Sequence, residues 1–183
     1  MLSLTGLLVS PTGFIGPFAE DFIITPGNAD EPSTSLVVYN FLAGPEKTFC
    51  TFPVGYVDVR DVAAAMVASI KLEGSHRLLL TGEWFDLADA IQYIAATRPE
   101  LAPRLIKAGS NGQNRPVIDS KKALEVLGIT LTPWKKTIDD GLDAVLEVEK
   151  DWIEKGVDPT VLKNNGYIAL VDAGANIRVE FTD

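Results

Sequence analysis

Residues 7–18 read LLVSPTGFIGPF, a short apolar run that ends in glycines and prolines. A buried strand passes into a loop in this way, because glycine and proline interrupt regular backbone pairing. In open α/β sheets, ligands bind beyond the carboxyl ends of the strands. The pattern therefore places a candidate site at the C-terminal end of this strand.

Strand and helix patterns alternate further along the chain. Residues 54–59 and 76–81 predict two strands, and each is followed by helical spacing, at 60–70 and at 86–97. The intervening residues 19–33 are rich in turn formers and predict a surface loop. This alternation predicts an α/β fold, a small mixed or parallel sheet with flanking helices.

Three further segments complete the predicted architecture. Residues 35–43 predict a short helix, and residues 119–128 another, capped by Asp119 or Ser120 and ended by Gly128. A long helix is expected from a Thr132 cap to about residue 155. The tail differs in character: residues 167–181 predict a terminal β-hairpin. We therefore divide the chain into a main region, 1–155, and an appended tail, 156–183.

Composition and charge limit the classes of function. The 183 residues are 46% hydrophobic, which is typical of a globular domain, and the net charge of −9 disfavours binding to nucleic acid or anionic lipid. The sequence contains no run of about 18 apolar residues, so it predicts no membrane helix. A single cysteine, Cys50, excludes an intrachain disulfide and suits a reducing compartment, so we expect a cytoplasmic protein.

Five segments, taken in order, carry a family resemblance. They are PTGFIGPF at 11–18, YVDVRDVA at 56–63, RLLLTG at 77–82, DSKKALEVLG at 119–128 and PWKKTIDD at 133–140. Together they resemble the C-terminal, substrate-side half of an extended short-chain dehydrogenase/reductase, in the NAD(P)-dependent epimerase/dehydratase superfamily. The nearest groups are the dihydroflavonol, cinnamoyl-CoA and fungal aldehyde reductases.

The resemblance implies a Rossmann-like fold, a small-molecule carbonyl substrate, and NADP(H) or NAD(H) as cofactor. Carried over residue by residue, it implies that Pro11, Thr12 and Phe14 line the nicotinamide end of the cofactor. The residues that it places beside the substrate are Gly16, Phe18 and Phe22. It also implies that Asp58, Arg60 and Asp61 buttress the fold.

Two family features are missing from the 183 residues. None of the four tyrosines has a lysine four positions later, and no glycine-rich phosphate loop follows a strand near the start. We therefore assign no catalytic residue, and expect a truncated reductase or pseudoenzyme that binds the cofactor weakly or not at all without a phosphate site.

Two classes of function remain open. The first is a reductase-derived chain that is active only with a partner carrying the missing Rossmann half. The second is a non-redox small-molecule binding protein, or an isomerase or cyclase of a secondary-metabolite pathway, that reuses the substrate cleft. Bare strand edges predict either that Rossmann-half partner or a homodimer, with tail strands able to add to the sheet.

Several chemically suggestive residues have simpler explanations. Asp58 and Asp61 lie at a strand-to-helix junction, where carboxylates cap helices. His76 is the only histidine, which rules out a histidine-based metal cluster, and we assign no metal site. Cys50, between aromatic residues, suits a buried apolar position better than a nucleophile. Trp134, near the start of the long helix, suits a core position.

Overall fold

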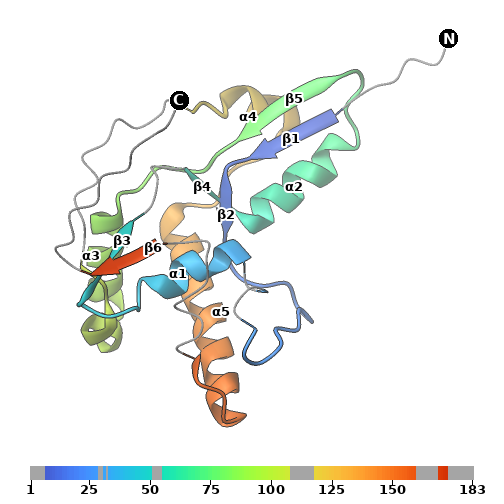
Figure 1. Cartoon of the computed structure of the whole chain (residues 1–183). Coiled ribbons are helices and arrows are strands. Elements are labelled where there is room, and N and C mark those ends of the chain that lie inside the picture. Colours follow the sequence, from blue (N-terminus) through green and yellow to red (C-terminus); the bar gives the residue numbers. More distant parts are fainter. Residues whose placement is uncertain are drawn as a thin grey trace, which may run out of the picture.

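A computed structural model of the chain describes residues 7–28, 31, 33–50, 55–107, 118–159 and 169–172 (Figure 1). For residues 33, 48–50 and 169–172 it describes the backbone only. None of the helices in these ranges is long and apolar enough to cross a membrane. In chain order the elements are β1 (Leu7–Pro11), β2 (Gly13–Ile15), the 3-10 helix η1 (Ser33–Ser35), α1 (Leu36–Asn40), β3 (Lys47–Cys50), β4 (Tyr56–Asp58), α2 (Val59–Ser69), β5 (His76–Leu80), α3 (Leu87–Thr97), the 3-10 helix η2 (Pro99–Arg104), α4 (Lys121–Leu127), α5 (Trp134–Glu154) and β6 (Ala169–Asp172).

The strands form three two-stranded sheets. β1 pairs in parallel with β5, from Leu7 opposite His76 to Pro11 opposite Leu80. β2 pairs in parallel with β4, and β3 pairs antiparallel with β6. The chain changes direction between β1 and β2 and passes from one parallel pair to the next at Thr12 (Figure 1).

One small core lies beneath the β1–β5 pair. Leu78 and Leu80 of β5 point toward α2 and α4 and are almost fully buried among their side chains. Burial of such a leucine stabilises the fold by about 1.5–3 kcal/mol. The opposite face of the sheet carries Leu8 of β1 and Leu79 of β5, which are 49% and 42% exposed. In the described part of the chain, this sheet is therefore covered on one face only.

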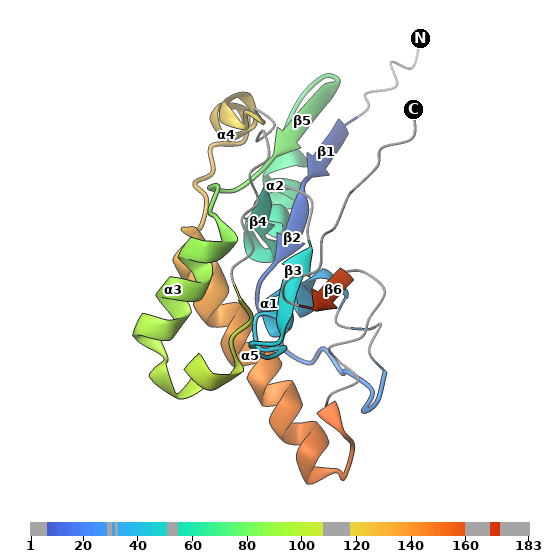
Figure 2. The same cartoon turned by 60° about the vertical axis from the view of Figure 1, so that its left-hand side comes forward.

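A larger core joins α1, α3, η2 and α5, which Figure 2 shows together below the parallel strands. All five residues of α1 are buried, because this short helix lies directly on α5. Gly141 permits the close approach: a Cβ there would lie 3.3 Å from a methyl group of Val38. This core holds α5 beneath the loop that follows β2.

The structure confirms the α/β class and the predicted strands and helices of residues 7–11, 56–69, 76–97 and 119–155 to within a few residues. The 35–43 helix is shorter than predicted, since η1 precedes α1. The strands β2 and β3 and the helix η2 were not predicted. In the tail, β6 pairs with β3 across the chain; the expected second hairpin strand, at 177–181, lies outside the described residues.

The predicted cap of the long helix is wrong. Helix α5 begins at Trp134 with Pro133 in the cap position, and Thr132 lies one residue too early to cap it. Both the backbone N–H and the hydroxyl of Thr132 instead donate to Asp61, at 2.7 and 2.9 Å. A tertiary partner has therefore taken the groups that the local pattern assigned to helix capping.

Candidate functional site

The carboxyl ends of β1 and β5 meet at Thr12. The Thr12 N–H donates to the carbonyl oxygen of Leu80 at 2.9 Å, and its hydroxyl donates to that of Thr81 at 3.2 Å. Pro11 has no N–H and ends β1, where the strand no longer needs a donor. These contacts fix the backbone at the point where loops of an α/β fold carry function.

A glycine allows the neighbouring backbones to cross here. The N–H of Gly82 donates to the carbonyl oxygen of Tyr56 at 3.0 Å. A Cβ at position 82 would lie 2.2 Å from the same oxygen, well inside contact distance. Only glycine fits this crossing, which ties the end of β5 to the start of β4.

Phe14 and Gly16 lead from β2 into the following loop. Phe14 is 40% exposed, and its carbonyl oxygen accepts a hydrogen bond of 2.6 Å from the Thr34 hydroxyl. Gly16 has a φ of +144°, a conformation open to glycine but costly for other residues, and its carbonyl oxygen accepts from Ser35 at 3.2 Å. The two bonds hold the turn against the 3-10 helix before α1.

The loop after Gly16 forms one wall of a groove. The rings of Phe18 and Phe22 stack with centroids 5.9 Å apart and planes 13° from parallel. Opposite them lies α5, including Val148 and Trp152, and the space between has a volume of about 770 Å³. That volume falls within the range of about 300–1,000 Å³ that is usual for small-molecule sites.

Carboxylates outnumber cations along this groove. Six acidic side chains line it, against two basic ones, Arg60 and Lys155. The acidic residues are Glu20, Asp21, Asp140, Asp143, Glu147 and Asp151. Such a lining repels a dinucleotide phosphate, which is strongly anionic, and admits neutral or cationic molecules. The groove therefore suits a substrate better than the phosphate end of a cofactor.

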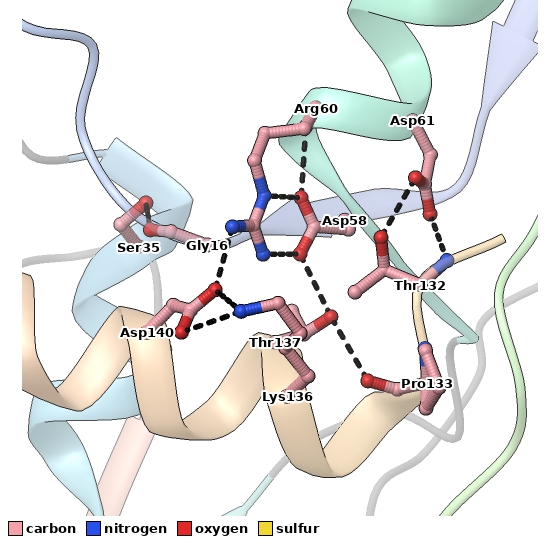
Figure 3. Close-up of polar contacts among 10 residues, drawn as sticks. All are labelled: Gly16, Ser35, Asp58, Arg60, Asp61, Thr132, Pro133, Lys136, Thr137 and Asp140. Atoms are coloured by element: carbon pink, nitrogen blue, oxygen red, sulfur yellow. Dashed lines mark hydrogen bonds and ion pairs between the residues drawn. The ribbon is translucent and has the colours of Figure 1, made fainter.

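The floor beside the groove is a charged cluster around Asp58, shown in Figure 3. Asp58 caps α2 by accepting from the Arg60 N–H at 2.9 Å, and accepts from the Arg60 guanidinium at 2.8 and 2.6 Å. The Thr137 hydroxyl of α5 donates to the same carboxylate at 2.8 Å, and Arg60 also donates to Asp140 at 2.5 Å. The cluster fastens α2 to α5.

The same contacts set the protonation states. Burial by itself would raise the pKa of Asp58, but the hydrogen bonds from Arg60 and Thr137 outweigh it and the pKa lies below its ordinary value. The pKa of Asp140 is lowered likewise: burial opposes the shift, and Lys136 and Arg60 cause it. Both carboxylates are therefore ionised at neutral pH, and each serves an ion pair.

The tyrosines with a resolved shift are poor proton donors. Burial and a hydrogen bond to Glu149 raise the pKa of Tyr39, and a hydrogen bond of 2.5 Å to Asp139 raises that of Tyr93. A catalytic tyrosine needs the opposite shift, normally from a nearby cation. Both hydroxyls instead donate to carboxylates of α5, Glu149 and Asp139.

The structure separates the predicted site residues into two groups. Phe18 and Phe22 line the groove, and Gly16 makes the turn that leads to it. The other group, Pro11, Thr12 and Phe14, lies along β1 and β2, on the approach to that turn. The assigned binding roles of all six remain predictions.

The wall contributed by α5 was not predicted from sequence. Its acidic and apolar groove residues, such as Glu147 and Trp152, lie about 130 positions from the loop that they face. In the sequence α5 reads as an amphipathic helix, and nothing local distinguishes groove-lining from solvent-facing carboxylates.

The structure tests two of the simpler explanations, those for the two aspartates and for Trp134. Asp58 caps α2 as predicted, whereas Asp61 bonds to Thr132 and joins α2 to the start of α5. Trp134 stacks on Phe85 with centroids 4.9 Å apart and packs against the larger core. The side chain of Cys50 lies outside the described residues. Across the ranges that are described, no cluster of metal-ligating side chains occurs.

Three known reductases resemble this chain in sequence, although no family model matches it. An NADPH-dependent methylglyoxal reductase of Saccharomyces cerevisiae is 33% identical over 126 residues, covering 64% of this chain and 37% of its own length. A putative NADPH-dependent methylglyoxal reductase of Candida albicans is 25% identical and covers 76% and 42%. Cinnamoyl-CoA reductase 1 of Arabidopsis thaliana is 26% identical and covers 68% and 38%.

Solved structures agree with these matches. The yeast methylglyoxal/isovaleraldehyde reductase, in complex with NADPH, superposes with a TM-score of 0.62 at 25% identity, over 78% of this chain and 43% of that one. The Candida albicans counterpart gives a TM-score of 0.64 at 21% identity, over 78% and 44%. The chain thus spans about two fifths of the length of the relatives that it matches.

Proposed function

We infer from the chain's membership of the extended short-chain dehydrogenase/reductase family that it forms the substrate-side wall of an NADPH-dependent carbonyl reductase. The observation that carries this proposal is the continuity of residues 11–22. One run of backbone leaves the end of β1 at Pro11, passes the exposed ring of Phe14, and enters the groove at Phe18 and Phe22. Such a run can touch the nicotinamide with its first part and the substrate with its second.

The chemistry that the 183 residues supply is binding and orientation. Bound NADPH would supply the hydride, and a carbonyl compound would accept it. The sequence holds neither the tyrosine and lysine pair nor the glycine loop. We therefore propose that the chain by itself binds NADPH weakly and does not reduce carbonyl compounds, and that a segment carrying those features completes the enzyme. Its single cysteine supports a cytosolic location.

The uncovered side of the β1–β5 sheet supports such a completing segment. Parallel strands are almost always covered on both faces, and two strands alone are marginally stable. Among the described residues only β5 pairs with β1, and Leu8 and Leu79 are exposed on the open face. A Rossmann half that adds strands beside β1, with helices packed over the open face, would cover both leucines and place its cofactor near Pro11.

The test is reconstitution with the amino-terminal part of the Saccharomyces cerevisiae reductase that this chain does not match. Calorimetric titration of the 183-residue chain with NADPH should give little or no heat. The mixture should oxidise NADPH in the presence of methylglyoxal, and Phe22→Ala should slow it more than the control Ile153→Ala, outside the groove. Tight NADPH binding by the chain alone, or no oxidation by a mixture that forms a stable complex, would count against the proposal.

The groove also supports a second function, binding of a small molecule without redox chemistry. The groove is lined by residues of this chain alone, so a ligand can enter it without any completing segment. Under this alternative the chain acts as a binding module, or as an isomerase or cyclase. Intrinsic tryptophan fluorescence should respond to neutral aromatic aldehydes without NADPH, and Phe22→Ala should weaken that response. An unchanged response in Phe22→Ala would exclude this groove as the binding site.

A further inference from the structure

Three of the six carboxylates in the groove are neutralised by ion pairs. The pairs are Asp140 with Arg60, Asp143 with Arg98 and Asp151 with Lys155, at 2.5, 2.5 and 2.7 Å. They engage both basic side chains that line the groove, Arg60 and Lys155. Neither of these cations is therefore free to balance the other acidic residues.

The other three carboxylates of the groove have no such partner. Glu20 and Asp21 belong to the loop after Gly16, and Glu147 belongs to α5, which forms the opposite wall. All three are exposed, and within the described ranges none of them forms a hydrogen bond or an ion pair. Both walls of the groove therefore carry negative charge that no cation of this part of the chain offsets.

Aromatic rings accompany these carboxylates in the loop. Phe18 and Phe22 flank Glu20 and Asp21 in the sequence and stack on one another, and Phe22 is 51% exposed. The face of an aromatic ring attracts an organic cation through the ring quadrupole. Carboxylates and an accessible ring in one groove thus favour the same kind of ligand for two independent reasons.

The opposite wall contains a hydrogen-bond donor without an acceptor. Trp152 lines the groove and is fully buried, and its indole N–H has no hydrogen-bond partner among the described residues. Buried polar groups of folded proteins almost always have a partner. A ligand that carries an oxygen atom can supply the missing acceptor. This donor is therefore a second sign, independent of the charges, that the groove receives a ligand.

We propose that the substrates of this groove are carbonyl compounds that carry an ammonium group on an apolar body. The inference rests on the proposed function, because it takes the groove to be the substrate site. The ammonium group lies among Glu20, Asp21 and Glu147, and the apolar body packs on the phenylalanine rings. A carbonyl compound also brings the oxygen acceptor that Trp152 lacks. The same charges disfavour anionic substrates such as coenzyme A thioesters, because the groove repels their phosphates.

Calorimetric titration of the full chain with two ketones of the same shape, without NADPH, tests this charge preference. The 4-acetyl-N,N,N-trimethylanilinium ion carries a fixed positive charge, and 4-tert-butylacetophenone is its uncharged isostere. The cation should bind at least about tenfold more tightly, because three carboxylates and an aromatic ring each contribute. This preference should shrink as the salt concentration is raised, because salt screens exposed charges.

Glu147→Gln should weaken binding of the cation about two- to fivefold and leave binding of the uncharged ketone unchanged. The matched control is Glu154→Gln on the same helix, which removes the same charge from a side chain that is 66% exposed and does not line the groove. It should leave both affinities unchanged. Combining Glu147→Gln with Glu20→Gln and Asp21→Asn should abolish the preference for the cation.

Equal binding of the two ketones by the wild-type chain, or a preference that survives the triple variant, would overturn the proposal. An equal loss in Glu154→Gln would also overturn it, because the preference would then reflect the total charge of the chain. These binding measurements are independent of reductase activity. A chain that selects the cation but yields no NADPH oxidation on reconstitution would contradict the proposed function alone. An active reconstituted enzyme that binds both ketones alike would contradict the substrate class alone.

Discussion

Replacing Asp58 with alanine tests whether the charged cluster fastens α2 to α5. Asp58 is 2% exposed and accepts four hydrogen bonds, three from Arg60 and one from the Thr137 hydroxyl. The substitution removes the cap of α2 and the acceptor of a buried hydroxyl in a single step. It leaves the apolar cores unchanged, so the loss of unfolding free energy measures what the cluster contributes to stability.

The expected loss can be built from its parts. An N-cap contributes about 1 kcal/mol. Leaving the buried Thr137 hydroxyl with only its longer contact, 3.4 Å to the Pro133 carbonyl oxygen, costs about 1–2 kcal/mol. The Arg60 side chain is 41% exposed, so its ion pair adds no more than about 1 kcal/mol. Together these give about 3 kcal/mol, or a fall in Tm of roughly 6–12 °C for a domain of this size.

Urea denaturation followed by circular dichroism provides the measurement. The matched control is Lys136→Ala, which removes a side chain of the same cluster that is 60% exposed and bonded to Asp140. The control should lose less than about 0.5 kcal/mol. If the unfolding free energy of Asp58→Ala lies within about 0.5 kcal/mol of the wild-type value, the cluster does not hold the two helices together.

Three further predictions concern pH, backbone approach and a buried amide. The pKa of Asp58 in the folded chain lies below its ordinary 3.8, so the ionised carboxylate stabilises the fold fully above about pH 4, and this stabilisation is lost as pH falls through the folded pKa. The difference in unfolding free energy between wild type and Asp58→Ala, measured in urea, should therefore shrink below about pH 4. Gly82→Ala should lower the unfolding free energy by more than about 2 kcal/mol, since the new methyl group would lie 2.2 Å from the Tyr56 carbonyl oxygen, and a normal melting curve would contradict this. Asn40→Leu should raise stability by about 1 kcal/mol in the same urea assay, because the buried amide has no hydrogen-bond partner among the described residues; a lower Tm would show that the amide has one.

The sequence predicts those features that are formed by residues close together in the chain. The end of β1 was predictable from residues 7–18, because an apolar run and its glycine and proline stops are adjacent in the chain. The cap at Asp58 was predictable for the same reason, since the bonded N–H belongs to Arg60, two residues later. Both predictions depend on backbone geometry that a few neighbouring residues determine.

The features that were not predictable depend on distant partners. Thr132 has the side chain of a helix cap, and only the arrival of Asp61, 71 positions away, assigns its hydroxyl elsewhere. β3 has four residues, and its partner β6 comes more than a hundred residues later. The groove likewise forms only when α1 holds α5 beneath the loop of Phe18. The pattern of neighbouring residues does not indicate which distant segments will come into contact.

Apolar side chains are exposed both on the β1–β5 sheet and on α2 in the described part of the chain. Leu8 and Leu79 lie on the open face of a parallel sheet, where an added strand and its helices would cover them. Val67 lies on the side of α2 that faces away from the strands and is 64% exposed. If the completing segment binds the sheet alone, Leu8→Lys should abolish reconstitution of reductase activity, and Val67→Lys should leave it intact. Loss of reconstitution in Val67→Lys would mean that the completing segment also covers α2.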